Sequence, residues 1–423
     1  MRVLWLCNII LPSAAEKLNL KASNKEGWLS GICDVVKENR DFELGIGFPV
    51  PMDRDGCSFT ADGITYFGFY EDTVHPEIYD ASLETRLGGI LKEFQPDMVH
   101  IFGTEFPHTL AMCKCMRHAP EKVLIGMQGI VEACREHYVD GVPERVVNRV
   151  TFRDFVKHDS IKQQREKFAK RAVHEAEALK LVGHVTGRTP FDLEFTTGIN
   201  HNARYHFMNE TLRPEFYEGA WKIDECETHR IFLSQGNYPL KGLHYMLQAA
   251  GILKDKYPDM KIYVAGDKIT ARKTVKDKIK ISSYGKYLLE LIRENGLKDM
   301  VIFTGSLTAE EIKEQLLKAS VFVCPSSIEN SPNSLGEAML LGVPCVAAEV
   351  GGIPGLFKKD VDGLMFARGD YKELAYCIDT MWSDTAMAIS SGETASMHAH
   401  TTHNPELNYK RLLEIYGEIT ECK

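Results

Sequence analysis

Short apolar runs alternate with amphipathic segments along the first half of the chain. Runs rich in β-branched and aromatic residues predict strands at residues 3–7, 42–46, 64–69, 98–102, 123–127 and 179–185. The spacing of apolar residues between these runs predicts helices near residues 26–38, 78–93, 108–118 and 161–177. Strands that alternate with helices in this way indicate an α/β fold with a doubly wound parallel sheet.

The same alternation starts again in the second half of the chain. The predicted strands there are residues 231–234, 261–265, 301–304, 321–323 and 343–347, and the predicted helices lie near residues 242–254, 284–294, 310–318 and 334–341. A chain of 423 residues also exceeds what one hydrophobic core usually supports. We therefore expect two Rossmann-like domains, residues 1–212 and 213–404, and a final helix within residues 405–423 that follows a polar segment at 390–404.

Composition narrows the class of protein. The formal net charge of -9 argues against a dedicated nucleic-acid-binding protein. The 11 cysteines are scattered, and Cys113 and Cys115 are too closely spaced for a metal motif, which favours reduced thiols in a cytoplasmic protein. The apolar N-terminus carries a single Arg and is interrupted by Asn8, which favours a first strand over a signal peptide. No other segment has the length of a membrane span.

Two glutamates, Glu329 and Glu337, flank the junction of a predicted strand and a predicted helix. Glu329 lies in the loop, and Ser334 with Glu337 matches a capping box that starts the helix. At such a junction, free backbone N–H groups and the helix dipole hold anions such as phosphate. Taken alone, the two glutamates have a simpler interpretation. Glu337 would only cap the helix, and Glu329 would be an ordinary solvated acid of the loop.

The surrounding residues change that interpretation. The spacing of the two acids, the Asn-Ser-Leu segment at 333–335 and the Gly-Val-Pro at 342–344 resemble the Glu-x7-Glu motif of retaining glycosyltransferases of family 4, of the bacterial polysaccharide-biosynthesis type. Residues 350–354 and 362–370 resemble the next two landmarks of that family. The resemblance implies the GT-B fold, in which two Rossmann-like domains face each other across a cleft and the C-terminal helix crosses back to the first domain.

The resemblance also implies roles in binding a nucleotide-sugar donor. Glu337 is expected to accept hydrogen bonds from the ribose hydroxyls, and Glu329 is expected to hold the donor sugar and to act in catalysis. The backbone N–H groups expected to bind the diphosphate are those of Asn333, Ser334 and Leu335. The expected neighbours of the base follow a predicted strand and are Gly305, Ser306 and Leu307.

A lysine stands where a second phosphate contact is expected. The segment 231–243 predicts a strand, a turn at Gly236 and a helix, and Lys241 lies at the helix N-terminus, where it can neutralise a phosphate as a point charge. This segment resembles the Gly-Arg-x5-Lys-Gly loop of the family, which implies that Lys241 acts in catalysis. Gln235 occupies the place of the arginine. Either Lys241 and the helix dipole suffice, or another basic residue such as Arg188 supplies the second charge.

Candidates in the first domain are less specific. Gly27 corresponds to the family's glycine-rich turn after the first strand and would let the backbone approach the donor, but a tolerated glycine at a helix N-terminus fits equally well. Polar residues near the ends of later strands are candidates for the acceptor side: His100, Thr104, Glu105, His108, Gln128 and Arg188. Family members often carry a histidine at the place of Gln128, so a histidine acid or base is excluded there.

No metal ion or cofactor is expected. Asp53-Arg-Asp55 has the form of the Asp-x-Asp metal motif of the other major glycosyltransferase fold, but its flanking Pro and Gly residues are typical of a solvated loop. The dinucleotide motif Gly-x-Gly-x-x-Gly does not follow any predicted strand, and the Walker phosphate motif is absent. Fixed hydrogen-bond donors together with Lys241 would stabilise the leaving diphosphate instead.

One segment of this acidic chain is basic. Residues 145–171 carry nine Lys or Arg against three Asp or Glu, with apolar residues between them. A solvated helix face is one interpretation. The other is a surface for a polyprenyl-linked acceptor or for peripheral contact with an anionic membrane at its inner face.

Together these observations predict a retaining glycosyltransferase that moves a hexose-type sugar from a nucleotide-diphosphate sugar to a hydroxyl of a saccharide or lipid-linked acceptor. A sugar-nucleotide epimerase of the GT-B type would keep the fold and change the chemistry. A non-catalytic, two-lobed sugar-binding protein is the alternative from a different class, and it would need neither Lys241 nor Glu337.

Overall fold

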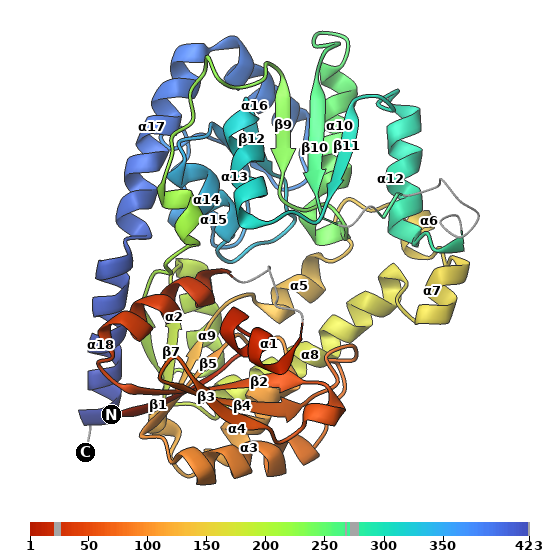
Figure 1. The fold of residues 1–423 in the computed structure, drawn as a ribbon. Coiled ribbons are helices and arrows are strands. Elements are labelled where there is room, and N and C mark those ends of the chain that lie inside the picture. The colour runs from red at the N-terminus through yellow and green to blue at the C-terminus, as the bar shows by residue number, and fades with distance from the viewer. Residues whose placement is uncertain (21–26, 267–268, 271–278, 422–423) are drawn as a thin grey trace. The chain divides into compact units, whose positions relative to one another are not determined.

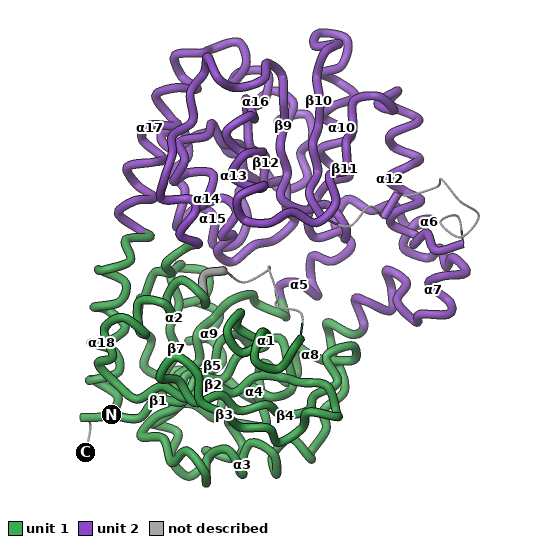
Figure 2. The backbone as a smooth tube through the Cα atoms, viewed as in Figure 1, with its two compact units in different colours: residues 1–132, 167–212, 403–423 green, residues 133–166, 213–402 purple. Residues whose placement is uncertain are grey.

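A computed structural model describes residues 1–20, 27–266, 269–270 and 279–421 of the chain (Figure 1). The described residues group into two compact units (Figure 2). Unit 1 consists of residues 1–132, 167–212 and 403–423, and unit 2 consists of residues 133–166 and 213–402. The grouping of residues 133–166 with unit 2 differs from the expectation that residues 1–212 form one domain.

Unit 1 is built on an eight-stranded sheet with the order β3-β4-β2-β1-β5-β6-β7-β8. All neighbouring strands are parallel except β3 and β4. The strands are β1 (Arg2–Leu6), β2 (Glu43–Val50), β3 (Ser58–Ala61), β4 (Ile64–Tyr70), β5 (Met98–Phe102), β6 (Val123–Gly126), β7 (His184–Gly187) and β8 (Arg204–Phe207). The prediction of a doubly wound, mainly parallel sheet is confirmed for this half of the chain.

Helices cover the sheet of unit 1, and the C-terminal helix is one of them. Tyr416 of α18 lies in the hydrophobic core beside Phe42, and its hydroxyl accepts a hydrogen bond of 2.8 Å from the indole Nε1 of Trp5 in β1. The final helix therefore packs on the first sheet, as the GT-B resemblance implies. The helices that begin in this unit are α1 (Pro12–Leu18), α2 (Gly27–Asn39), α3 (Ser82–Phe94), α4 (Pro107–Cys115), α5 (Val131–His137), α9 (Pro190–Ile199) and α18 (Pro405–Glu421).

Unit 2 is built on a six-stranded parallel sheet with the order β11-β10-β9-β12-β13-β14. Its strands are β9 (Arg230–Leu233), β10 (Lys261–Ala265), β11 (Val301–Gly305), β12 (Val321–Cys324), β13 (Cys345–Glu349) and β14 (Leu364–Ala367). The helices that begin in it are α6 (Glu144–Val147), α7 (Phe152–Lys157), α8 (Ile161–Lys180), α10 (Leu243–Leu253), α12 (Ser283–Glu294), α13 (Ala309–Lys318), α14 (Asn333–Leu340), α15 (Ile353–Leu356), α16 (Tyr371–Ser383) and α17 (Thr385–Thr402).

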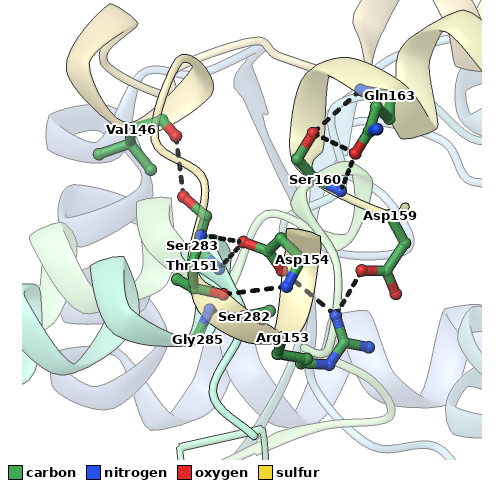
Figure 3. Close-up of polar contacts among 10 residues, drawn as sticks. All are labelled: Val146, Thr151, Arg153, Asp154, Asp159, Ser160, Gln163, Ser282, Ser283 and Gly285. Atoms are coloured by element: carbon green, nitrogen blue, oxygen red, sulfur yellow. Dashed lines mark hydrogen bonds and ion pairs between the residues drawn. The ribbon is translucent and has the colours of Figure 1, made fainter. Parts of the chain in front are cut away.

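Polar contacts hold α6 and α7 to α12 within unit 2 (Figure 3). The buried carboxylate of Asp154 accepts a hydrogen bond of 2.9 Å from the backbone N–H of Ser283, and the hydroxyl of Ser283 donates to the carbonyl of Val146 at 2.9 Å. Arg145 also pairs with Glu290 at 3.0 Å. These partners lie more than 100 residues apart in the sequence, so the local pattern could not assign residues 133–166 to the second unit.

Two predicted elements are wrong. Helix α8 continues to Lys180, so β7 begins only at His184 rather than at residue 179. The polar segment expected at residues 390–404 is largely helix α17, whose small residues Ser391, Gly392 and Ala395 are buried. A helix that buries small residues lacks the large apolar side chains that mark an amphipathic pattern, which explains why the sequence did not predict it.

Candidate active site

The loop between β12 and α14 carries the two predicted glutamates. Helix α14 begins at Asn333 with Pro332 as its N-cap, and no side chain caps it. The predicted capping box of Ser334 and Glu337 is therefore wrong, because Ser334 already lies inside the first helical turn. The carboxylate of Glu337 has a different partner, so helix capping does not explain the presence of this acid.

That partner is Arg213. Its Nε donates to Oε1 of Glu337 at 2.7 Å, and its Nη2 donates to Oε2 at 2.7 Å, which is the bidentate geometry of a strong ion pair. Glu337 is only 4% exposed. Burial raises the pKa of Glu337 above its ordinary value, and the Arg213 guanidinium opposes that rise. Both carboxylate oxygens of the residue expected to bind ribose are thus already engaged.

Lys241 and Glu329 form the second ion pair of this loop region. Nζ of Lys241 donates to Oε1 of Glu329 at 2.6 Å, and the hydroxyl of Ser326 donates to the same oxygen at 2.7 Å. Burial alone would lower the pKa of Lys241, but the neighbouring Glu329 carboxylate and the Tyr238 hydroxyl raise it above its ordinary value. The lysine is therefore cationic and has a fixed partner.

Glycines shape the turn that presents Lys241. A Cβ atom at Gly236 would lie 2.6 Å from Leu243 and 2.8 Å from Val264, so the turn after β9 has no room for a side chain. Gly242 has a φ of 66°, and a side chain there would collide with the carbonyl of Pro325. Lys241 therefore ends a short 3-10 helix against the loop after β12, two residues before α10 begins. The predicted helix start at residue 242 is off by one residue.

The remaining donor-binding candidates differ in their position and in whether their backbone N–H groups are already hydrogen-bonded. Gly305 is the last residue of β11 and has a φ of 85°, and Ser306 and Leu307 follow it at the carboxyl edge of the same parallel sheet. Because the loops after β9, β11 and β12 share that edge, the structure brings these candidates to one side of unit 2. The N–H of Leu335 donates to the carbonyl of Pro332 at 3.0 Å, so this group is not free to bind a diphosphate as the structure stands. Gly27 is the first residue of α2, and residues 24–26 of its turn lie outside the described residues.

The two predicted histidines of unit 1 are buried, and each has a partner within the unit. His100 is fully buried in β5, and its Nδ1 lies 2.7 Å from the hydroxyl of Tyr416. Burial lowers the pKa of His100 to about 3, so the ring is neutral. His108 is also buried, and its Nδ1 lies 2.7 Å from the carboxylate of Glu71. Both rings have partners inside the unit, which is typical of core histidines.

Thr104 and Glu105 follow β5 and hold the start of α5. Thr104 donates to Oε1 of Glu175 at 2.6 Å, and the same carboxylate accepts the backbone N–H of Val131 at 3.0 Å. Glu105 accepts the backbone N–H of Gly129 at 3.0 Å. Burial raises the pKa of Glu175 to about 7. The sequence did not indicate that Glu175 is buried, because it lies in a helix whose many charged residues are typical of a solvated surface.

A small pocket in unit 1 brings other candidates together. Its lining includes His100 within β5, and Gln128 and Arg188, which lie just after the ends of β6 and β7. It also includes Glu210, which accepts a hydrogen bond of 2.6 Å from Gln128 and forms a buried ion pair with Arg188. Within this unit the charge of Arg188 is balanced by Glu210.

The described residues contain no group of three or more His, Cys, Asp or Glu side chains that could hold a metal ion. In the Asp53-Arg-Asp55 segment, Asp55 is not a free loop acid, because it pairs with Arg86 at 2.8 Å and accepts the N–H of Tyr70 at 2.8 Å. Asp55 is nevertheless exposed, as expected of a solvated loop. No helix within the described part of the chain is both long enough and apolar enough to cross a membrane.

Part of the chain matches a known family. Residues 218–396 match the family described as "Glycosyl transferases group 1". Over 148 residues the chain is 32% identical to the amylovoran biosynthesis glycosyltransferase AmsK of Erwinia amylovora, and this alignment covers 33% of the chain and 36% of that protein. The chain therefore spans about a third of the length of this curated relative.

The fold is similar to that of solved structures along its whole length. Sucrose-phosphate synthase from Thermosynechococcus elongatus has a TM-score of 0.75 and 13% identity, with 100% of both chains covered. Anabaena Alr3699/HepE, solved in complex with UDP-glucose, has a TM-score of 0.65 and 16% identity, with 99% of this chain and 100% of that chain covered. At these identities the likeness establishes the fold. The chain therefore has the GT-B fold, and its residues 218–396 match the glycosyl transferases group 1 family.

Proposed function

We propose that this protein is a retaining glycosyltransferase, which moves a hexose-type sugar from a nucleotide-diphosphate sugar to a hydroxyl of a saccharide or lipid-linked acceptor. The observation that carries the proposal is the pair of ion pairs in unit 2, Lys241 with Glu329 and Arg213 with Glu337. They place two carboxylates and two cations around the loop that leads into α14. A donor with sugar hydroxyls, a diphosphate and ribose hydroxyls presents the complementary groups.

The family match and the fold support this proposal. The match to group 1 glycosyltransferases lies within unit 2, and its residues 218–396 include Lys241, Glu329 and Glu337 but not Arg213. The structural neighbour Alr3699/HepE was solved with UDP-glucose, which supports a nucleotide sugar as the donor here. We propose that the nucleotide sugar is a substrate and that the enzyme has no cofactor.

The residues of unit 2 would act on the leaving group. In the reaction the bond between the anomeric carbon and the diphosphate oxygen breaks, and a bond from the acceptor oxygen to that carbon forms on the same face. The electron pair of the broken bond stays on the diphosphate, and the proton of the acceptor hydroxyl leaves with it. Lys241 and the N-terminus of α14 would stabilise this charge, since fixed donors are effective where charge develops. Glu329 would hold the hydroxyls of the transferred sugar.

The two alternative functions have less support. An epimerase of the GT-B type would need a histidine and acids that can exchange protons with the sugar nucleotide. His100 and His108 are buried and have partners within unit 1, which does not favour that chemistry. A protein that binds only free sugars would not need a cationic Lys241 in its site.

We also propose that the protein is cytoplasmic and contacts a membrane peripherally through helix α7. The helix exposes Phe152 and Phe155 at 68% each and Val156 at 55%. Contacts with the rest of unit 2 fix its position (Figure 3). Several basic residues nearby are already paired, among them Arg153, which lies 2.8 Å from Asp159. Insertion of apolar side chains therefore accounts for the contact better than the excess of positive charge does.

A thermal-shift screen tests the proposed function. A ligand that binds the folded state raises the apparent stability by mass action. The full chain is screened against UDP, GDP and ADP, against the matching nucleosides, and against free glucose, galactose and mannose. We expect one nucleoside diphosphate to raise the unfolding temperature while the free sugars do not. Stabilisation by free sugars alone would identify a sugar-binding protein instead.

A further inference from the structure

The guanidinium of Arg213 occupies the carboxylate proposed to bind ribose. Two hydrogen bonds of 2.7 Å join it to Glu337, and its carbon atom lies 4.7 Å from the centre of the Phe216 ring. The side chain of Arg213 is 14% exposed and that of Glu337 is 5% exposed. Arg213 is therefore a cation held in a fixed place, partly open to solvent, beside a buried acid.

The position of Glu337 on α14 places this ion pair near the helix N-terminus. Helical side chains lean toward the turn that precedes them, so the carboxylate of Glu337 extends over the turn that begins at Asn333. The first turn of a helix carries N–H groups that lack acceptors within the helix and attract anions. A diphosphate bound there would lie close to the Arg213 guanidinium.

A bound donor would change the partners of both ion pairs. Ribose hydroxyls can donate to Glu337, which keeps the buried carboxylate hydrogen-bonded when Arg213 turns away. The planar guanidinium binds phosphate oxygens in the same bidentate way as it binds a carboxylate. Lys241 is paired with Glu329 and provides one positive charge. Gln235, in the loop after β9, provides none. Arg213 can supply a second charge.

We propose that Arg213 is a donor-binding residue that exchanges partners. In the donor-free protein it neutralises Glu337, and with the donor bound it turns to the diphosphate while the ribose hydroxyls take over Glu337. The proposal rests on the proposed function of this site. It deepens that function, because it makes Arg213 the residue that distinguishes a nucleoside diphosphate from a nucleoside.

Calorimetric titration of Arg213 variants tests this exchange. The nucleoside, its monophosphate and its diphosphate are titrated into the full chain, with uridine, guanosine or adenosine chosen by the strongest diphosphate binding to wild type. For Arg213→Gln we expect the diphosphate to bind about tenfold more weakly or worse, as for the loss of a charge-assisted hydrogen bond. The nucleoside should bind as well as to wild type or better, because Glu337 is no longer occupied. The preference for diphosphate over nucleoside should fall by about tenfold.

Two further variants keep the test decisive. Arg293→Gln removes a positive charge from an exposed residue of the same unit and should change neither affinity. Arg213→Lys keeps the charge and should fold even if the glutamine variant does not, with a diphosphate affinity between those of wild type and a full loss.

The possible failures are distinguishable. If Arg213→Gln and Arg213→Lys leave the diphosphate preference unchanged, or lower both affinities equally, Arg213 is a fixed clamp on Glu337 and the exchange is wrong. If both affinities rise equally, Arg213 only competes with the ribose, which also contradicts the exchange. If wild type binds none of the nucleoside diphosphates, the proposed function itself fails and the inference fails with it.

Discussion

Nζ of Lys241 lies 2.6 Å from Oε1 of Glu329, so the cation proposed to stabilise the leaving group is paired with the acid proposed to hold the sugar. The two residues come from loops after different strands of one parallel sheet, β9 and β12. Each neutralises the other in the donor-free protein. A donor with hydroxyls and a diphosphate can replace both partners at once, which is the basis of the predictions for these residues.

Loss of the lysine charge should weaken donor binding. Lys241→Met keeps most of the aliphatic side chain and removes the ammonium group. Because a charge-assisted hydrogen bond contributes about 1.5–3 kcal/mol, the affinity for the nucleoside diphosphate should fall by about ten- to a hundredfold. Calorimetry on the folded variant measures this, with Lys286→Met, at an exposed lysine of the same unit, as the control. Unchanged affinity would show that Lys241 does not contact the diphosphate.

Glu329 should matter more for turnover than for nucleotide affinity. Glu329→Gln removes the negative charge next to the transferred sugar, while the nucleoside diphosphate without a sugar does not reach this residue. We expect kcat to fall by orders of magnitude and the affinity for the free diphosphate to change little. Steady-state kinetics with the nucleotide sugar and calorimetry with the diphosphate separate the two effects. A variant with full turnover would show that Glu329 has been assigned the wrong role.

Catalysis should not require a divalent metal ion. Lys241 and the N-terminus of α14 are placed to take the charge that a metal ion would otherwise neutralise. We expect turnover to remain after treatment with EDTA. Activity that is lost with EDTA and restored by Mn²⁺ or Mg²⁺ would contradict this.

Helix α7 should bring the protein to lipid vesicles. Phe152→Ser and Phe155→Ser together remove the two most exposed apolar side chains of α7 and should abolish co-sedimentation. Tyr376→Ser, at an equally exposed aromatic residue of unit 2, is the matched control and should not change it. Because Arg145, Arg149 and Arg153 are paired with acids, binding should weaken only modestly between low and high salt. Wild type that stays in the supernatant with anionic vesicles would leave α7 as an ordinary solvated helix.

The buried acid Glu175 should make stability depend on pH. Its pKa is raised to about 7 in the folded protein, so the folded state holds the proton more tightly than the unfolded state. This contribution to stability is fully present below about pH 4.5 and is lost as the pH rises to about 7. At about 1.4 kcal/mol per pKa unit the loss amounts to a few kcal/mol at most.

Urea unfolding of Glu175→Gln and of wild type at several pH values measures this contribution. The free energy of unfolding of wild type should fall relative to that of the variant between pH 4.5 and 7. Parallel pH profiles for the two proteins would show that Glu175 does not titrate in this range.

The sequence predicted most strands of both sheets, because they are short apolar runs with regular helical spacing between them, but it did not predict β3, β8 and β14. It also predicted Lys241 and Glu329, since a glycine turn and a strand–helix junction leave local signals. The partner of Glu337 could not be predicted. Arg213 and Glu337 lie 124 residues apart, and nothing near either residue indicates the other.

Other differences between the predictions and the structure also arise from contacts between residues far apart in the sequence. The candidate histidines have ordinary local sequences, which do not indicate their partners Tyr416 and Glu71. Helices α6 and α7 join unit 2 through contacts with α12, which follows them by more than a hundred residues. Long-range pairing of polar groups, rather than local pattern, decides each of these cases.

A crystal structure of the full chain with its preferred nucleoside diphosphate tests the central claim most directly. We predict that the ribose hydroxyls donate to Glu337, that the diphosphate lies at the N-terminus of α14, and that Nζ of Lys241 lies within hydrogen-bond distance of a phosphate oxygen. A nucleotide bound elsewhere, with Lys241 still on Glu329 and Arg213 still on Glu337, would contradict the assignment of this site.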